Sequence, residues 1–210
     1  MAGLKVNNLT TEVFQDLSFN LPKTGLLGIV GRNGVGKSTL FSTINGEIKV
    51  SDNCIESGKV SYIPNLEIFD KHLSAQDYLR LLKVDEQVVF QKNLETMGGA
   101  NFLKQKIGKY SLGMKELFAI LYLLSIQSDL IIFDELLDGL DEQRRFRAYK
   151  LLKEQSKTKL ILLTSHNLSE VFEVCDCVYL LEKDSLKSID RRDLERVMFS
   201  SGDFRYESKS

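Results

Sequence analysis

Gly31-Arg32-Asn33-Gly34-Val35-Gly36-Lys37-Ser38-Thr39 is the stretch that decides the fold, and it directly follows an apolar run at 26–30. Its spacing, G-x-x-x-x-G-K-S, is that of a phosphate-binding loop. The glycines let the backbone curl so that its N–H groups approach phosphate oxygens. Lys37 supplies a cation for the β- and γ-phosphates, and the Ser38 hydroxyl suits a Mg²⁺ shell. A helix at 38–44 follows, and its N-terminal dipole favours the bound anion.

The composition is that of a globular protein with one sizeable core. Of the 210 residues, 43% are apolar, and the net charge of −1 offers no general attraction to nucleic acid or anionic lipid. No apolar run approaches the length of a bilayer span, and the N-terminus lacks the basic start and apolar core of a signal peptide. We therefore expect a single cytoplasmic domain over residues 1–210 that does not bind nucleic acid.

The three cysteines fit a reducing compartment better than a disulfide framework. Cys175 and Cys177 form a C-x-C pair, a spacing that also occurs in metal sites. They stand at the start of a predicted buried strand, and no third or fourth ligand lies nearby. We therefore interpret them as ordinary packed thiols.

The rest of the chain alternates predicted strands and helices. Apolar runs predict strands at 13–21, 26–30, 59–63, 130–133, 160–163, 178–181 and 186–189. Apolar periodicity predicts a buried helix at 112–126 and an amphipathic helix at 141–157, on which Arg144, Arg145 and Arg147 form a solvated face. Residues 66–110 are expected to be mostly helical, with a capping box at Ser74 and Asp77.

This alternation predicts an α/β fold with a helical insert. The core is expected at about 1–65 and 129–200, and the helical subdomain at about 66–128. Gly98-Gly99 is expected to mark a turn within the insert. Residues 201–210 are expected to form a polar tail.

Three further motifs follow the phosphate loop in a fixed order. Ser111-Leu112-Gly113-Met114 stands at a helix start, and His166 ends the predicted strand at 160–163. Asp134-Glu135 ends the strand at 130–133, with Asp138-Gly139-Leu140-Asp141 just after it. With the phosphate loop, this order resembles the ATP-binding cassette (ABC) ATPases over about residues 4 to 190. The ordered set is more specific than any of its members.

The resemblance implies a P-loop NTPase with a mostly parallel central sheet, a small antiparallel β-subdomain and a helical subdomain. It implies ATP and Mg²⁺ as ligands, with Ser38, Asp134 and Asn65 at the metal. Glu135 matches the general base that polarises the attacking water, and His166 matches the switch histidine at the γ-phosphate. Glu135, His166 and Lys37 are thus the expected catalytic residues.

The resemblance also implies a nucleotide site shared between two cassettes. Ser111 and Gly113 lie where the family's signature faces the γ-phosphate of a second cassette, and 138–141 matches the segment that runs between the two sites. The nucleotide-binding residues implied are Gly31, Arg32, Asn33, Gly34, Val35, Gly36, Lys37, Ser38, Thr39, Ser111 and Gly113.

The function implied is that of the ATP-hydrolysing motor subunit of a membrane ABC transporter, exporter-like by its S-L-G-M-K signature. It would act as a head-to-tail homodimer or with a related cassette chain. A separate transmembrane permease would dock near Asn65 and 66–110, holding the chain at the inner face of the cell membrane. The alternatives are a soluble cassette outside transport and a weakly active regulatory cassette of a heterodimer.

Several positions depart from the family pattern. Asn65 replaces a glutamine and is shorter by one carbon–carbon bond, about 1.5 Å. Leu112 and Met114 replace a glycine and a glutamine of the signature, and Leu136 replaces a proline. No aromatic residue stands at 7–11 to stack on adenine; Phe14 is the nearest candidate and is also a candidate core residue. The short interval before Asn65 predicts a trimmed β-subdomain. We expect a working ATPase with weakened nucleotide contacts.

Overall fold

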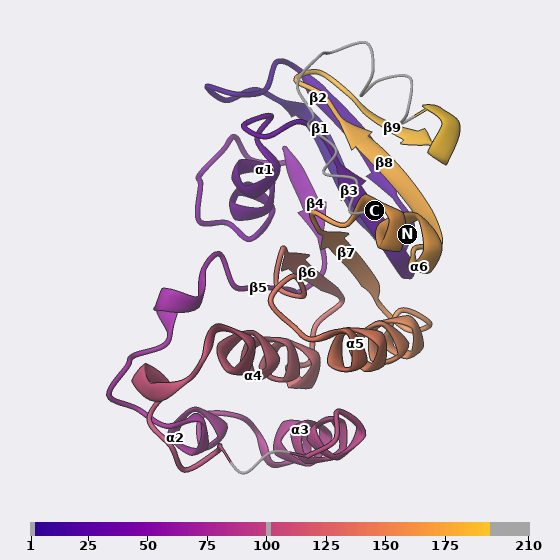
Figure 1. The fold of residues 1–210 in the computed structure, drawn as a ribbon. Helices are drawn as coiled ribbons and strands as arrows, with labels where there is room; N and C mark the ends of the chain where they lie inside the picture. Colours follow the sequence, from indigo (N-terminus) through magenta and orange to yellow (C-terminus); the bar gives the residue numbers. More distant parts are fainter. Residues whose placement is uncertain (1–2, 100–101, 194–210) are drawn as a thin grey trace.

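The computed structural model describes residues 3–99 and 102–193, and a six-stranded sheet lies at its centre (Figure 1). The strand order is β5-β6-β7-β3-β8-β9, with every neighbouring pair parallel except β8 and β9. The predicted tail at 201–210 lies outside the described residues. The strands of this sheet are β3 (Gly25–Val30), β5 (Val60–Tyr62), β6 (Leu130–Asp134), β7 (Leu160–Thr164), β8 (Cys177–Leu181) and β9 (Leu186–Ile189).

A second, antiparallel sheet of three strands has the order β2-β1-β4. Its strands are β1 (Leu4–Leu9), β2 (Leu17–Leu21) and β4 (Ile55–Ser57). The α/β class, the mainly parallel central sheet and the small antiparallel sheet are confirmed. The brief β4 follows α1 after a short connection, in keeping with the trimmed β-subdomain that the sequence predicted.

The helices lie in layers on the two faces of the central sheet (Figure 1). α1 lies on the side of the antiparallel sheet, α4 and α5 lie along the opposite face, and α2 and α3 pack outside α4. The helices are α1 (Lys37–Ile44), α2 (Ala75–Leu79), α3 (Val84–Thr96), α4 (Leu112–Ser125), α5 (Glu142–Gln155) and α6 (Leu168–Val174), with short 3₁₀ turns η1 (Leu66–Ile68) and η2 (Ile107–Lys109).

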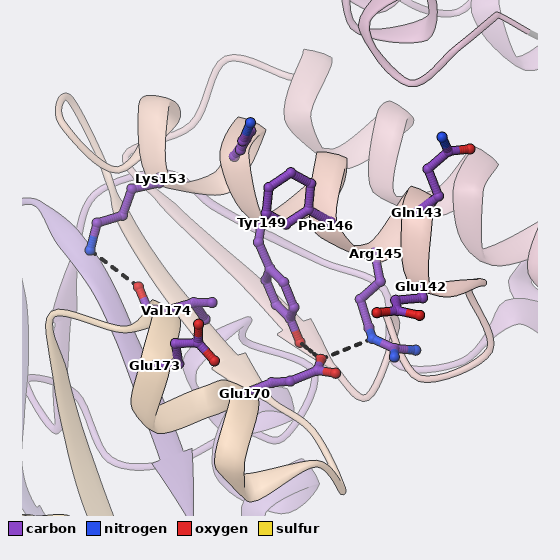
Figure 2. Close-up of a pocket in the computed structure, with 10 residues that line it drawn as sticks. Glu142, Gln143, Arg145, Phe146, Tyr149, Lys153, Glu170, Glu173 and Val174 are labelled. Carbon is purple, nitrogen blue, oxygen red and sulfur yellow. Dashed lines mark hydrogen bonds and ion pairs between the residues drawn. The ribbon is translucent and has the colours of Figure 1, made fainter.

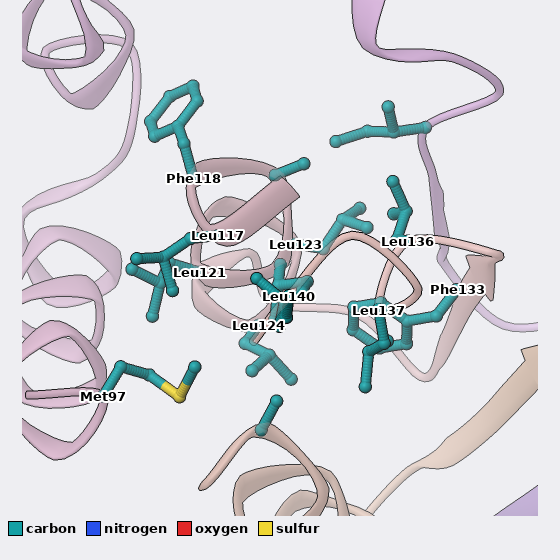
Figure 3. Packing of buried hydrophobic residues seen from close by; sticks show 14 of the residues in the cluster. Met97, Leu117, Phe118, Leu121, Leu123, Leu124, Phe133, Leu136, Leu137 and Leu140 are labelled. Carbon is teal, nitrogen blue, oxygen red and sulfur yellow. The ribbon is translucent and has the colours of Figure 1, made fainter. Parts of the chain in front are cut away.

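The central strands bury both faces, which explains their continuous apolar runs. Leu130 and Ile132 of β6 belong to a cluster with the antiparallel sheet and α1, whereas Ile131 and Phe133 join the cluster with α2, α3 and α4. Figure 3 shows the second cluster, in which Leu136, Leu137 and Leu140 contribute from the segment after β6. That segment is therefore anchored in the core.

Most predicted elements are confirmed, including the capping box of Ser74 and Asp77 at the start of α2. The predicted strand at 13–21 is wrong in its first half. Thr11 Oγ1 accepts hydrogen bonds from the backbone N–H groups of Val13 and Phe14, which closes a turn there, and only β2 is extended. The sequence analysis missed β1, β4 and α6. Asn8 interrupts the apolar pattern of β1 and takes a positive φ of 48°.

The aromatic cluster around Phe118 in α4 gives a first prediction. Its fully buried ring packs against Phe69 at a centroid distance of 4.9 Å and against Phe90 at 6.1 Å. Phe118→Ala is expected to lower the free energy of unfolding by about 3–5 kcal/mol, because it leaves a cavity in the core. Urea denaturation measures this loss. Phe146→Ala, at a site 59% exposed, is the control and should cost less than about 1 kcal/mol; equal losses would contradict the assigned core.

Candidate active site

The phosphate loop connects β3 to α1 and rests on the hydrophobic core. Gly36, the residue that precedes α1, has φ +107°, and a β-carbon on it would lie 2.6 Å from Val13 Cγ1 and 2.8 Å from the ring of Phe14. Only glycine suits this position, because both the backbone conformation and the neighbouring side chains exclude a side chain. Gly34 also has a positive φ, at 78°, but nothing crowds it.

Lys37 folds back over the loop. Its Nζ donates hydrogen bonds to the carbonyl oxygens of Gly31, at 3.0 Å, and Arg32, at 3.4 Å. The ammonium group thus lies over the loop whose backbone N–H groups would receive a phosphate. Arg32, Asn33 and Gly34 are exposed at its tip.

Three hydroxyl groups surround the carboxylate of Asp134 at the end of β6. Ser38 Oγ and Tyr62 OH donate to Oδ2 at 2.7 and 3.3 Å, and Thr164 Oγ1 donates to Oδ1 at 2.7 Å. The donors come from α1, β5 and β7. They meet because β5, β6 and β7 run parallel, so their carboxyl ends lie at the same edge of the sheet.

Tyr62 is held firmly as one of these donors. Its ring is 8% exposed and packs edge-on against Phe41 of α1 at a centroid distance of 6.0 Å. Burial and the neighbouring carboxylate of Asp134 both raise the pKa of the Tyr62 hydroxyl above its usual value. The hydroxyl therefore keeps its proton and remains a donor at neutral pH.

Glu135 and His166 face each other across the ends of β6 and β7. Glu135 Oε2 lies 3.2 Å from His166 Nε2, and both side chains are open to solvent, at 43% and 66%. Glu135 takes a positive φ of 56°, which is unusual for a residue with a side chain. Its backbone N–H donates to Thr164 Oγ1 at 3.0 Å, so the same hydroxyl holds Asp134 and the backbone of Glu135.

The segment 138–141, which follows these carboxylates, is attached to two neighbouring elements. Asp138 accepts hydrogen bonds from Ser165 Oγ at 2.5 Å and from the backbone N–H of His166 at 3.0 Å. Arg145 Nη1 donates to Leu140 O at 2.9 Å. The segment thus fixes the backbone of the histidine.

Arg145 corrects one sequence prediction. The arginines of α5 were expected to form a solvated face, but Arg145 is only 21% exposed and pairs with Glu170 at 2.9 Å, where the Tyr149 hydroxyl also donates (Figure 2). These groups line a hollow of about 660 Å³ between α5 and α6. The pattern of apolar residues on α5 gave no sign of this partner, because Glu170 lies on another helix.

Ser111 and Gly113 lie at the N-terminus of α4, where Gly113 approaches 138–141, and neither belongs to the cluster around Asp134. The Ser111 side chain caps α4 by accepting from the N–H of Met114. A β-carbon on Gly113 would lie 2.9 Å from Gly139 O.

The side chain of Asn65 caps η1, where Oδ1 accepts from the N–H of Glu67 at 2.9 Å. Phe14 is fully buried, which favours its role as a core residue over stacking on adenine.

The sequence profile of the ABC transporter family matches residues 14–138. The chain belongs to the ABC transporter family. It is an ATP-binding subunit and an ATPase of this family. Within the described residues, no helix is both long and apolar enough to cross a membrane.

Relatives of this ABC protein serve different transport systems. The chain is 28% identical over 205 residues to the chelated iron transport system membrane protein YfeB of Yersinia pestis, covering 86% of this chain and 69% of YfeB. It is 29% identical over 197 residues to the capsule polysaccharide export ATP-binding protein CtrD of Neisseria meningitidis, covering 90% of each. A solved structure of the ATP-binding subunit of an ABC transporter has the same fold, with a TM-score of 0.80 at 23% identity over 95% of this chain and 94% of that chain.

Two residues of this site were not found from the sequence: Tyr62 and Thr164. Each contributes a hydroxyl at the end of a strand, close to His166 or Asn65, which the sequence analysis did single out, but neither was given a role of its own. A tyrosine just before Ile63-Pro64 and a threonine at the end of an otherwise apolar strand were the only signals.

The shared role of Thr164 leads to a second prediction. Thr164→Val removes one hydroxyl that serves both Asp134 and the backbone of Glu135. We expect it to lower the free energy of unfolding by about 1–3 kcal/mol and to reduce the ATPase kcat at least about tenfold. Tyr62→Phe removes a single, longer hydrogen bond and should have a smaller effect on both. Urea denaturation and steady-state ATPase assays test this order, and the reverse order would refute the shared role of Thr164.

Proposed function

We propose that this chain is the ATP-hydrolysing motor subunit of an exporter-like ABC transporter. The observation that carries the proposal is the pairing of Glu135 with His166 at 3.2 Å, next to the hydrogen-bonded pair of Asp134 and Ser38. A general base and a γ-phosphate ligand need to lie side by side at the carboxyl edge of the sheet, opposite the phosphate loop.

Each group has a distinct role in the proposed reaction. Lys37 and the backbone of 31–39 bind the β- and γ-phosphates. Glu135 accepts a proton from the attacking water, and its open side chain leaves room for that water. His166 contacts the γ-phosphate from the next strand, and its position is maintained by Asp138 through the backbone N–H.

The residues at the strand edge suit Mg²⁺. Ser38 Oγ and Asp134 Oδ2 lie 2.7 Å apart, and hard oxygen ligands of this kind are those that Mg²⁺ prefers. When bound, the ion neutralises charge on the β- and γ-phosphates. Asn65 Oδ1 already accepts the capping hydrogen bond of η1, so the ion would have to share this oxygen with the N–H of Glu67.

The core at about 1–65 and 129–200 and the helical subdomain at about 66–128 would act together as one cassette. Ser111 and Gly113 would meet the nucleotide of a second cassette, either another copy or a related chain. A separate permease would dock near Asn65 and 66–110 and hold the chain at the inner face of the membrane. The signature S-L-G-M-K and the similarity to CtrD support export, whereas YfeB represents the competing metal-transport class.

Glu135→Gln provides the test of the proposed chemistry. The amide keeps the size of the side chain but cannot accept the proton of water, so kcat should fall by roughly 10²- to 10⁴-fold while ATP still binds. Steady-state hydrolysis with Mg²⁺ and equilibrium binding of ATP separate these two effects. Equal, near-zero rates in the parent and the variant would instead indicate a regulatory cassette that binds ATP without turnover.

The partners can be tested with the same variant. Tagged Glu135→Gln protein with ATP, captured from gently solubilised membranes, is expected to recover a polytopic membrane protein and to retain a second cassette. The number of helices and the genetic neighbours of that permease would separate export from metal transport. Recovery of soluble partners alone, with no chain at the membrane, would refute the transporter assignment.

A further inference from the structure

Glu116 is a buried carboxyl group to which no step of the proposed reaction assigns a role. It lies on α4, one turn beyond Gly113, and is 5% exposed. Within the described residues, its Oε2 atom has no hydrogen-bond partner. An unpartnered, buried carboxylate oxygen is costly, so its presence calls for an explanation.

The carboxyl group of Glu116 is packed directly onto Gly139. A β-carbon on Gly139 would lie 2.4 Å from Oε2 and 2.6 Å from Oε1, so the carboxyl occupies the space that a side chain there would need. One turn earlier on α4, a β-carbon on Gly113 would lie 2.9 Å from Gly139 O, so the two backbones also approach closely there. Two successive turns of α4 therefore contact the same residue of 138–141.

The surroundings of Glu116 control its charge. Burial raises its pKa to about 7, and the negative charge of Asp138 acts in the same direction. Hydrogen bonding from the backbone N–H of Gly139 opposes this rise. Asp138 and Glu116 are therefore two acidic groups at this contact: Asp138 belongs to the segment 138–141, which holds His166, and Glu116 packs against that segment.

We propose that Glu116 is a positioning residue that couples the N-terminus of α4 to 138–141 and, through Asp138, to His166. The inference rests on the proposed function, because Ser111, Gly113 and His166 are the groups expected to meet γ-phosphates. The ionised carboxylate is the stronger acceptor for the Gly139 N–H, so it holds 138–141 more tightly than the neutral acid does.

The first test does not depend on ATP hydrolysis. In the ¹⁵N-labelled full chain, the amide resonance of Gly139 should shift with pH between 5.5 and 8.5, with a midpoint near 7, and Glu116→Gln should abolish this shift. Because histidine also titrates in this range, the assignment rests on the difference between the two proteins.

Glu86→Gln is the matched control. Glu86 is also 5% exposed, but it lies on α3 and accepts backbone hydrogen bonds from Lys83 at 3.0 Å and Gln127 at 2.9 Å, which lower its pKa. This variant should lose stability and leave the titration of Gly139 unchanged. A Gly139 titration that persists in Glu116→Gln would overturn the proposal, as would its loss in Glu86→Gln.

Thermal stability supplies a second readout with a definite sign. The pKa of Glu116 is raised in the folded chain, so the parent loses stability as the pH rises from about 4.5 to about 7 and no further above that. Glu116→Gln lacks this titration. The Tm of Glu116→Gln minus the Tm of the parent should therefore be smallest near pH 5, increase up to about pH 7 and stay constant above that pH. A gain that is independent of pH would contradict the assigned ionisation.

Turnover separates coupling from a purely structural role. As the pH drops from 8 to 6, the kcat of the parent should fall about fivefold more than the kcat of Glu116→Gln, while KM stays constant. Identical pH profiles of kcat would leave Glu116 a structural residue and overturn the coupling. If neither protein hydrolyses ATP, the proposed function fails, whereas the Gly139 titration still decides the coupling.

Discussion

The Thr164 hydroxyl is the interaction on which the arrangement of the site depends. It donates to Asp134 and accepts from the backbone N–H of Glu135, so a single group at the end of β7 holds the last carboxylate of β6 and the backbone of the next residue. The two strands are in register at this point, with Asp134 opposite Thr164. Parallel pairing brings the ends of β6 and β7 together, and the hydrogen bonds of the Thr164 hydroxyl then fix the Asp134 side chain and the Glu135 backbone. The hydroxyl also helps to hold Glu135 in its left-handed backbone conformation, with φ +56°.

The fold was predictable where local pattern and burial agree. Strands β3, β6 and β7 are buried on both faces, so each appears as an unbroken apolar run, and their limits were close to those expected. The apolar pattern failed to predict strands where polar groups nearby in the sequence compete with the hydrogen bonds between strands. Thr11 closes a turn over the start of the predicted strand at 13–21, and the two asparagines of β1 conceal a strand, one of whose partners, β4, is remote in sequence.

The residues of the candidate site also fall into two groups, those that the sequence predicted and those that it did not. Ser38, Asp134, Glu135 and His166 belong to motifs with fixed spacing, and the structure brings all four to one sheet edge. Tyr62, Thr164, Arg145 and Glu116 were not foreseen, because their roles arise only from contacts between distant segments. Spacing along the chain reveals groups that act on a common ligand. It does not reveal the groups that hold them in place.

The hydrogen bonds of Lys37 within its own loop have a consequence for nucleotide binding. Its ammonium group donates to two carbonyl oxygens of the loop, which are acceptors of the same kind as the oxygens of a phosphate. An ammonium group has three N–H donors, so the loop carbonyls occupy two of them and leave one to point elsewhere. The carbonyl oxygens therefore compete with any anion in the loop for this cation, and they limit how far the flexible side chain can move away from the loop.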